Sequence, residues 1–66
     1  MEKHFMVTTV WADGFRREDE APSFEQAKNG FEIYIEDPDC RTCFVSVWTE
    51  MYANMVLYYD KRGLEG

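Results

Sequence analysis

Hydrophobic and polar positions divide the first twenty residues into two unlike runs. Residues 5–11 are mainly β-branched and aromatic, whereas residues 16–20 are all charged. The Asp13-Gly14 pair between them is typical of a two-residue type I′ turn, because both residue types tolerate positive φ angles. The pattern predicts a β-hairpin in which Trp11 faces Arg16. Charges on both sides of the second strand indicate a short edge strand.

Apolar residues take a helical spacing in the next segment. They recur at intervals of three or four residues, at Phe24, Ala27, Phe31, Tyr34 and Ile35, which is the repeat of one face of an α-helix. Ser23 is a favourable N-cap residue just ahead of this run. Asp37-Pro38 ends it, because the residue before proline avoids the helical region. The pattern therefore predicts one amphipathic helix.

Two further segments follow the predicted helix. Residues 43–48 alternate in the period of a β-strand. The last segment is ambiguous: residues 55–59 favour a returning antiparallel strand, whereas Thr49 could cap a helix that ends near Gly63. The strand interpretation predicts an α+β fold of ββαββ order, a small antiparallel sheet with one helix packed on one face. The helix interpretation gives ββαβα with a C-terminal helix.

A single helix can cover only one face of a four-stranded sheet, so the other face is expected to be open. Smaller side chains, at Thr8, Val10, Cys43, Val45 and Val47, would let the helix approach closely on their side. The open face then carries four aromatic residues, Phe5, Trp11, Phe44 and Trp48. Exposed aromatic patches are typical of protein-interaction surfaces. In the alternative, the two faces are exchanged or the C-terminal segment folds over the aromatic residues.

The length of 66 residues predicts one small domain, 1–66, with disordered ends at residues 1–3 and 63–66. A chain this short buries only about 60% of the surface that its unfolded form exposes, so its core would gain from a partner subunit. The sequence contains no apolar run of membrane-spanning length, and its first residues lack the pattern of a signal peptide. We expect a cytoplasmic protein that does not bind membranes.

Acidic residues are concentrated in the middle of the chain. The net charge is −6, and residues 18–39 hold eight acidic residues against Lys28 alone, which gives −7 for this segment and +1 for the rest. The acidic surface is expected at Glu18, Glu20, Glu25, Glu32, Glu36, Asp37 and Asp39. Such a surface either serves solubility or docks on a basic protein. Direct binding of nucleic acid is not expected, because phosphate contacts need clustered lysine and arginine.

Cys40 and Cys43 form a CxxC pair, the one recognisable chemical motif. A structural zinc site needs four ligands, and the sequence adds only the distant His4 to the two thiols. Thioredoxin-like reactivity requires the motif at a helix N-terminus after a strand, whereas this pair follows the helix and enters a strand. We expect no metal, cofactor or redox role, with Cys43 as a small core residue and Cys40 as a loop thiol.

No catalytic residues are expected. Ser23 is accounted for as a helix cap and Ser46 as a strand residue, and the glycines form no phosphate-binding loop. We therefore expect a small, acidic, non-enzymatic protein-interaction module, whose partner is a second copy or another protein and whose homodimer buries the aromatic face. The alternative is an acidic inhibitor or nucleic-acid mimic, of the phage or mobile-element type, that docks on a basic nucleic-acid-binding protein.

Overall fold

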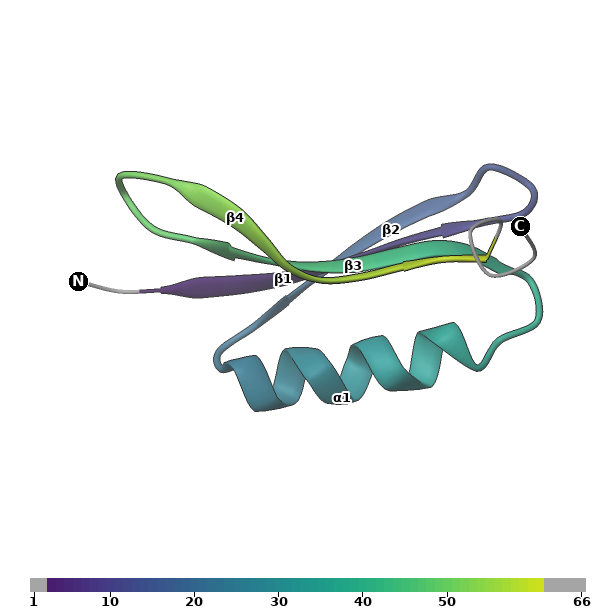
Figure 1. Cartoon of the computed structure of the whole chain (residues 1–66), viewed down its shortest axis with the longest axis horizontal. Coiled ribbons are helices and arrows are strands. Elements are labelled where there is room, and N and C mark those ends of the chain that lie inside the picture. The colour runs from purple at the N-terminus through teal and green to yellow at the C-terminus, as the bar shows by residue number, and fades with distance from the viewer. Residues whose placement is uncertain (1–2, 62–66) are drawn as a thin grey trace.

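The fold has the ββαββ order that the sequence predicts. A computed structural model describes residues 3–61 and contains β1 (His4–Trp11), β2 (Arg16–Ala21), α1 (Phe24–Ile35), β3 (Cys40–Trp48) and β4 (Ala53–Asp60). The four strands form one antiparallel sheet in the order β2-β1-β3-β4. The helix lies along one face of this sheet (Figure 1). The predicted α+β architecture is confirmed.

The C-terminal segment settles the ambiguity in the sequence. It forms strand β4, so the ββαβα alternative is wrong. Within residues 3–61, no helix combines the length and hydropathy that crossing a bilayer requires. The disordered ends expected at residues 1–3 and 63–66 lie, apart from Lys3, outside the described residues.

The turn between β1 and β2 differs from the predicted type. Gly14 has φ +91°, but Asp13 does not have a positive φ, whereas a type I′ turn requires positive φ at both central residues. The amide of Trp11 donates to the carbonyl oxygen of Phe15 at 2.9 Å, which closes a loop, residues 12–14, that is longer than the predicted two residues. The predicted register is therefore wrong by one residue, because Val10 takes the place opposite Arg16.

The helix begins and ends where the sequence signals predict. The hydroxyl oxygen of Ser23 accepts a hydrogen bond, 3.3 Å long, from the amide three residues along the chain, as an N-cap side chain does. Ala27 and Phe31, both from the apolar stripe, are buried beneath the helix. The last helical residue is Ile35, shortly before Pro38. These local signals thus set the length of the helix and the face that it buries.

The helix covers the side of β1 that was expected to be open, which corrects the placement of two aromatic residues. Phe5 packs against Phe24 at the start of α1, with ring centroids 6.0 Å apart. Trp11 meets Tyr34 near the end of α1 edge-on, at 5.8 Å. Between these two ring pairs the shorter, buried side chain of Val7 lies in the core. Small residues are needed only beneath the middle of the helix, so large rings fit at both of its ends.

The core lies between α1 and the two central strands. It comprises Val7, Ala21, Ala27, Phe31, Cys40, Cys43 and Val45. Val7 on β1 lies opposite Val45 on β3, so the β3 residues expected under the helix do lie there. Thr8 and Val10, also expected there, lie on the opposite side of the sheet. Among the described residues, β4 makes its extensive contacts with β3 and not with α1, so it extends beyond the cover of the helix.

Candidate interaction surface

The sheet face opposite α1 is lined mainly by apolar side chains. Residues that face each other across neighbouring strands share a side of the sheet, and Phe44 pairs with both Thr8 on β1 and Tyr58 on β4. The same alternation places six large apolar residues here, which we call the uncovered face: Met6, Val10, Phe44, Trp48, Met55 and Tyr58. The short side chains of Thr8 and Ser46 lie buried between them, at 2% and 8% exposure. The larger side chains therefore cover these two short ones.

Exposure on this face is greatest near β4. Trp48 is 48% exposed, and Met55 and Tyr58 are each 55% exposed. The indole Nε1 of Trp48 donates to the hydroxyl oxygen of Ser46 at 2.8 Å, so the polar atom of this side chain is satisfied and its ring remains as apolar contact area. The uncovered face therefore presents large aromatic and methionine side chains. The Trp48 ring could be buried by a partner without leaving its indole N–H unpaired.

The exposed apolar surface continues around the β3–β4 hairpin. Met51, Tyr52 and Val56 are all exposed, Met51 most of all. The loop that carries the first two is held by Thr49, whose hydroxyl oxygen accepts hydrogen bonds from the amides of Met51 and Tyr52, both at 3.2 Å. In Figure 1 this hairpin turns away from α1. These side chains are thus presented on an ordered turn, away from the cover of the helix.

The structure divides the four aromatic residues that were predicted to share one face. Phe44 and Trp48 lie on the uncovered face, whereas Phe5 and Trp11 pack against the helix. Sequence reasoning missed the other four residues of the uncovered face, Met6, Val10, Met55 and Tyr58. The signal that could have found Tyr58 is the strict alternation of a β-strand, but an irregularity opposite Val45 and Ser46 breaks that alternation before Met55.

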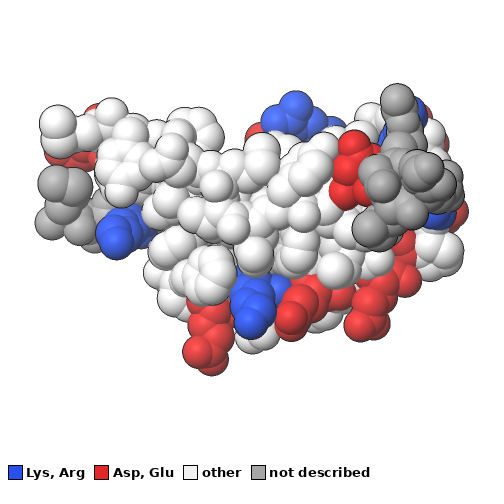
Figure 2. Space-filling model, viewed as in Figure 1, with Lys and Arg blue, Asp and Glu red and all other residues white. Residues whose placement is uncertain are grey.

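The acidic residues also divide between two regions. Those of α1 and of the loop that follows it are exposed, namely Glu25, Glu32, Glu36, Asp37 and Asp39. Figure 2 shows acidic side chains gathered along the edge of the molecule formed by α1, with basic atoms between them. Glu18 and Glu20 lie elsewhere, on β2, where they face Thr8 and Met6 and so border the uncovered face. The seven predicted acidic positions therefore do not form one surface.

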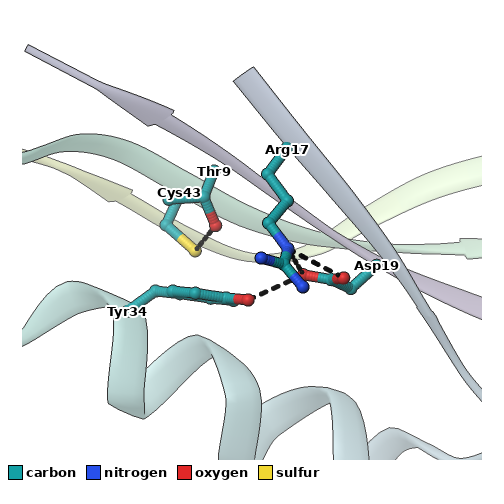
Figure 3. Close-up of polar contacts among 5 residues, drawn as sticks. All are labelled: Thr9, Arg17, Asp19, Tyr34 and Cys43. Carbon is teal, nitrogen blue, oxygen red and sulfur yellow. Dashed lines mark hydrogen bonds and ion pairs between the residues drawn. The ribbon is translucent and has the colours of Figure 1, made fainter. Parts of the chain in front are cut away.

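A polar contact ties β2 to the helix at the edge of the core. The hydroxyl of Tyr34 donates to a carboxylate oxygen of Asp19 at 2.7 Å, and the Nε of Arg17 donates to the same oxygen at 3.0 Å (Figure 3). The Tyr34 hydrogen bond is the main cause that lowers the pKa of Asp19, and Arg17 adds to it against the opposing effect of burial. The pKa of Tyr34 is raised, chiefly by the same hydrogen bond.

Tyr34→Phe is expected to lower the free energy of unfolding at pH 6 by about 1 kcal/mol, since the lost bond is to a charged but partly exposed carboxylate. The folded state depresses the pKa of Asp19, so this stabilisation is complete above the unfolded pKa of about 3.9 and is lost as the pH falls through the folded pKa. The difference between the two proteins in urea unfolding should therefore narrow towards pH 3.

Tyr52→Phe is the matched control for that change, because the hydroxyl of Tyr52 makes no hydrogen bond among the described residues and its side chain is exposed. Its stability difference from the wild type should stay small and constant with pH. A Tyr34→Phe difference that widens as the pH falls would show that Asp19 does not act as described.

Both cysteines are free and fully buried, each at 0% exposure. Cys40 is the first residue of β3 and part of the core, so its expected role as a loop thiol is wrong. The Sγ of Cys43 lies 3.4 Å from the hydroxyl oxygen of Thr9 (Figure 3). Burial raises the pKa of both thiols, and the charge of Asp37 raises that of Cys40 further. The CxxC pair therefore fills the core as small apolar side chains.

Among residues 3–61, one surface depression lies at each end of β1. One, of about 320 Å³, is lined by Trp11, Ala12, Asp13, Phe15 and Asp39. The other, of about 290 Å³, is lined by Lys3, His4, Glu20, Ala21 and Pro22. Neither lining includes a cysteine, serine or threonine. Among residues 3–61 no three or more histidine, cysteine or acidic side chains are grouped so as to hold a metal ion.

The surface that stands out is therefore the uncovered face together with the hairpin that borders it. Comparison of the chain with protein families, with curated proteins and with solved structures finds no match.

Proposed function

We propose that the protein is a small, non-enzymatic interaction module that works as a homodimer, and that the two copies meet on the β3–β4 side of the uncovered face. The observation that carries this proposal is the exposure of Met55 and Tyr58 on β4, which lie beside Trp48 of β3 on a sheet face that the helix leaves bare. Tryptophan, tyrosine and methionine are enriched at protein interfaces.

The size of the chain supports the same proposal. Full burial of one large apolar side chain contributes about 1.5–3 kcal/mol, and a 66-residue domain has a small core from which to draw stability. The half-exposed side chains on this face keep apolar area in contact with water when the copy is alone. A second copy would supply that burial twice, since each residue of a two-fold interface contributes from both subunits.

Sedimentation of the reduced protein over a wide dilution series tests the proposal, with Met55→Glu as the variant. The wild type is expected to be a dimer that dissociates on dilution. Two copies of Glu at a shared contact are expected to raise the dissociation constant by about a hundredfold or more, because like charges placed together at an interface cost several kcal/mol. Met55 is 55% exposed, so the monomer should tolerate the change.

Ile33→Glu is the matched control. Ile33 is a large apolar residue that is 69% exposed, but it lies on α1 and away from the uncovered face. The same change in charge at this position should leave the dissociation constant within a few-fold of the wild-type value. A wild-type protein that stays monomeric at the highest concentrations would overturn the proposal.

A second function is favoured by the acidic residues of the helix. Glu25 and Glu32 on α1 and Glu36 at its C-cap are all exposed, and Figure 2 shows acidic side chains along the edge of the molecule that α1 forms. We propose as the alternative that this edge mimics nucleic-acid phosphates and docks on a basic nucleic-acid-binding protein. Charge of this kind acts at a distance and weakens with salt.

Competition with DNA for a set of purified basic DNA-binding domains tests this second function. A triple change of Glu to Gln at residues 25, 32 and 36 should abolish competition. A control triple that removes the same charge elsewhere, at Glu18, Glu20 and Glu50, should retain it. Equal loss with both triples would mean that only the net charge matters, and no competition by the wild type would remove the acidic-mimic function.

A further inference from the structure

The two edges of the sheet are chemically opposite. β2 forms one edge, and its first five residues are all charged, from Arg16 to Glu20. β4 forms the other edge, and it carries no charged residue from Ala53 to Tyr59. An edge strand presents a row of backbone amide and carbonyl groups to any strand that approaches, and charged side chains are the usual protection against such pairing. β2 has this protection along most of its length. β4 lacks such charges, and the irregularity at Val56 interrupts its edge at one position only.

The outer side of β4 is also open to an approaching chain. Met55, Val56 and Tyr58 are exposed at 55%, 43% and 55%. β3 pairs Val45 with Leu57 and Ser46 with Met55, so Val56 has no partner residue on β3. Among residues 3–61 the helix makes its main contacts with β1, β2 and β3, and Leu57 and Tyr59 of β4 pack against the edge of the core. The exposed side chains of this strand can therefore be reached by another chain.

The distribution of charge indicates which chain pairs there. Residues 18–39 carry −7, and they include most of β2 and all of α1, whereas β4 lies at the opposite edge of the sheet from β2. Two copies that meet at β4 keep these acidic segments far apart, while contacts through α1 or β2 would bring them together. Like charges brought together at an interface oppose association. The charge distribution therefore favours β4 over α1 and β2 as the place where a second copy docks.

The charged edge also limits the assembly to two copies. Growth into longer sheets would require β4 of one copy to pair with β2 of the next, a head-to-tail contact that propagates without closing. The charges of β2 disfavour that contact. Pairing of β4 with β4 uses the same strand from both copies, so it closes at a dimer.

We propose that β4 pairs antiparallel with β4 of a second copy, so that two four-stranded sheets join into one continuous sheet of eight strands. This inference rests on the proposed homodimer. It names β4 as the strand whose backbone hydrogen bonds join the two copies. Met55 and Tyr58 of both copies then lie across the seam on the uncovered face, where cross-strand neighbours pack against one another.

Amide hydrogen exchange followed by NMR tests the pairing. Along an edge strand, alternate amides point outwards and are free in a monomer. At a concentration about 100 times the dissociation constant, the outward amides of β4 are expected to exchange about tenfold more slowly than in dilute protein. Two sets of amides are internal controls: the inward amides of β4, which pair with β3, and all amides of β2. Their exchange rates should not show this tenfold slowing at high protein concentration.

A pair of lysine substitutions separates edge pairing from contact between faces. Val56→Lys places a charge on the free edge, whereas Trp48→Lys places the same charge on the uncovered face of the inner strand β3. Edge pairing predicts that Val56→Lys raises the dissociation constant at least tenfold and that Trp48→Lys has a smaller effect. Circular dichroism confirms in each case that the variant is folded.

Three outcomes can be told apart. Slowed outward amides with the stronger effect at Val56 support the edge dimer. A dimer that Trp48→Lys dissociates, with outward amides unprotected, would overturn the edge pairing and leave the homodimer in place with its faces in contact. A protein that remains monomeric would overturn both the homodimer and the edge pairing.

Discussion

Phe31→Ala is expected to leave much of the protein unfolded at 25 °C. Phe31 is only 8% exposed and lies in the core between α1 and the central strands. Truncation of a buried phenylalanine to alanine costs about 3–5 kcal/mol. A domain of 66 residues has a total stability of about 3–10 kcal/mol, at roughly 0.05–0.15 kcal/mol per residue. One side chain therefore represents a large part of the stability of the whole fold.

Urea unfolding followed by circular dichroism measures this effect at a fixed protein concentration, because the proposed dimer would add to the apparent stability. Ile33→Ala is the matched control, since it removes a large apolar side chain from the same helix at a position that is 69% exposed. The control should change the free energy of unfolding by about 0.5 kcal/mol or less. Equal losses from the two variants would mean that α1 does not bury the face described.

The two thiols are expected to react with DTNB at least about a hundredfold more slowly in the folded protein than in denaturant. Cys40 and Cys43 are both at 0% exposure, so the reagent reaches them only after local opening, and an opening that costs about 2.8 kcal/mol is populated about 1% of the time. Burial also raises the pKa of both thiols, which lowers the fraction of reactive thiolate near neutral pH.

The variants Cys40→Ala and Cys43→Ala assign the two rates, because each leaves a single thiol. Protection should be similar for both, since each side chain is part of the core. A fast reaction of Cys40 alone would restore the view, taken from the sequence, that this residue is a loop thiol. Rapid reaction of both thiols in folded protein would contradict the packing of β3 against α1.

Local signals in the sequence predicted the helix and the strands. Which side chains lie on which face of the sheet depends on pairing between distant strands, so it was predicted less well. The cap at Ser23 and the helical stripe through Phe31 act within a few residues, and the helix follows them. The turn at Gly14 was placed correctly but its type was not, because Asp13 keeps a negative φ and the loop gains a residue. That single residue shifts the register of the whole hairpin.

The sequence predicted only part of the candidate surface, and the reason is physical. A side chain on β1 or β3 belongs to the covered or the uncovered face only once the register between those strands is fixed, and that register is a tertiary property. The prediction assigned large side chains to the open face, and this rule failed for Phe5 and Trp11, which are large yet pack at the two ends of the helix. Phe44 and Trp48 were placed together correctly because they share one strand and its alternation.

The strand order also determines how the chain must fold. β1 with β2 and β3 with β4 are hairpins between neighbouring segments, whereas β1 and β3 come from opposite sides of the helix in sequence. Closing a longer loop costs more entropy before any contact rewards it. We therefore expect the alignment of β1 with β3, together with the docking of α1, to be the rate-limiting event. Changes at that central seam should slow folding, whereas changes at the outer strands should mainly speed unfolding.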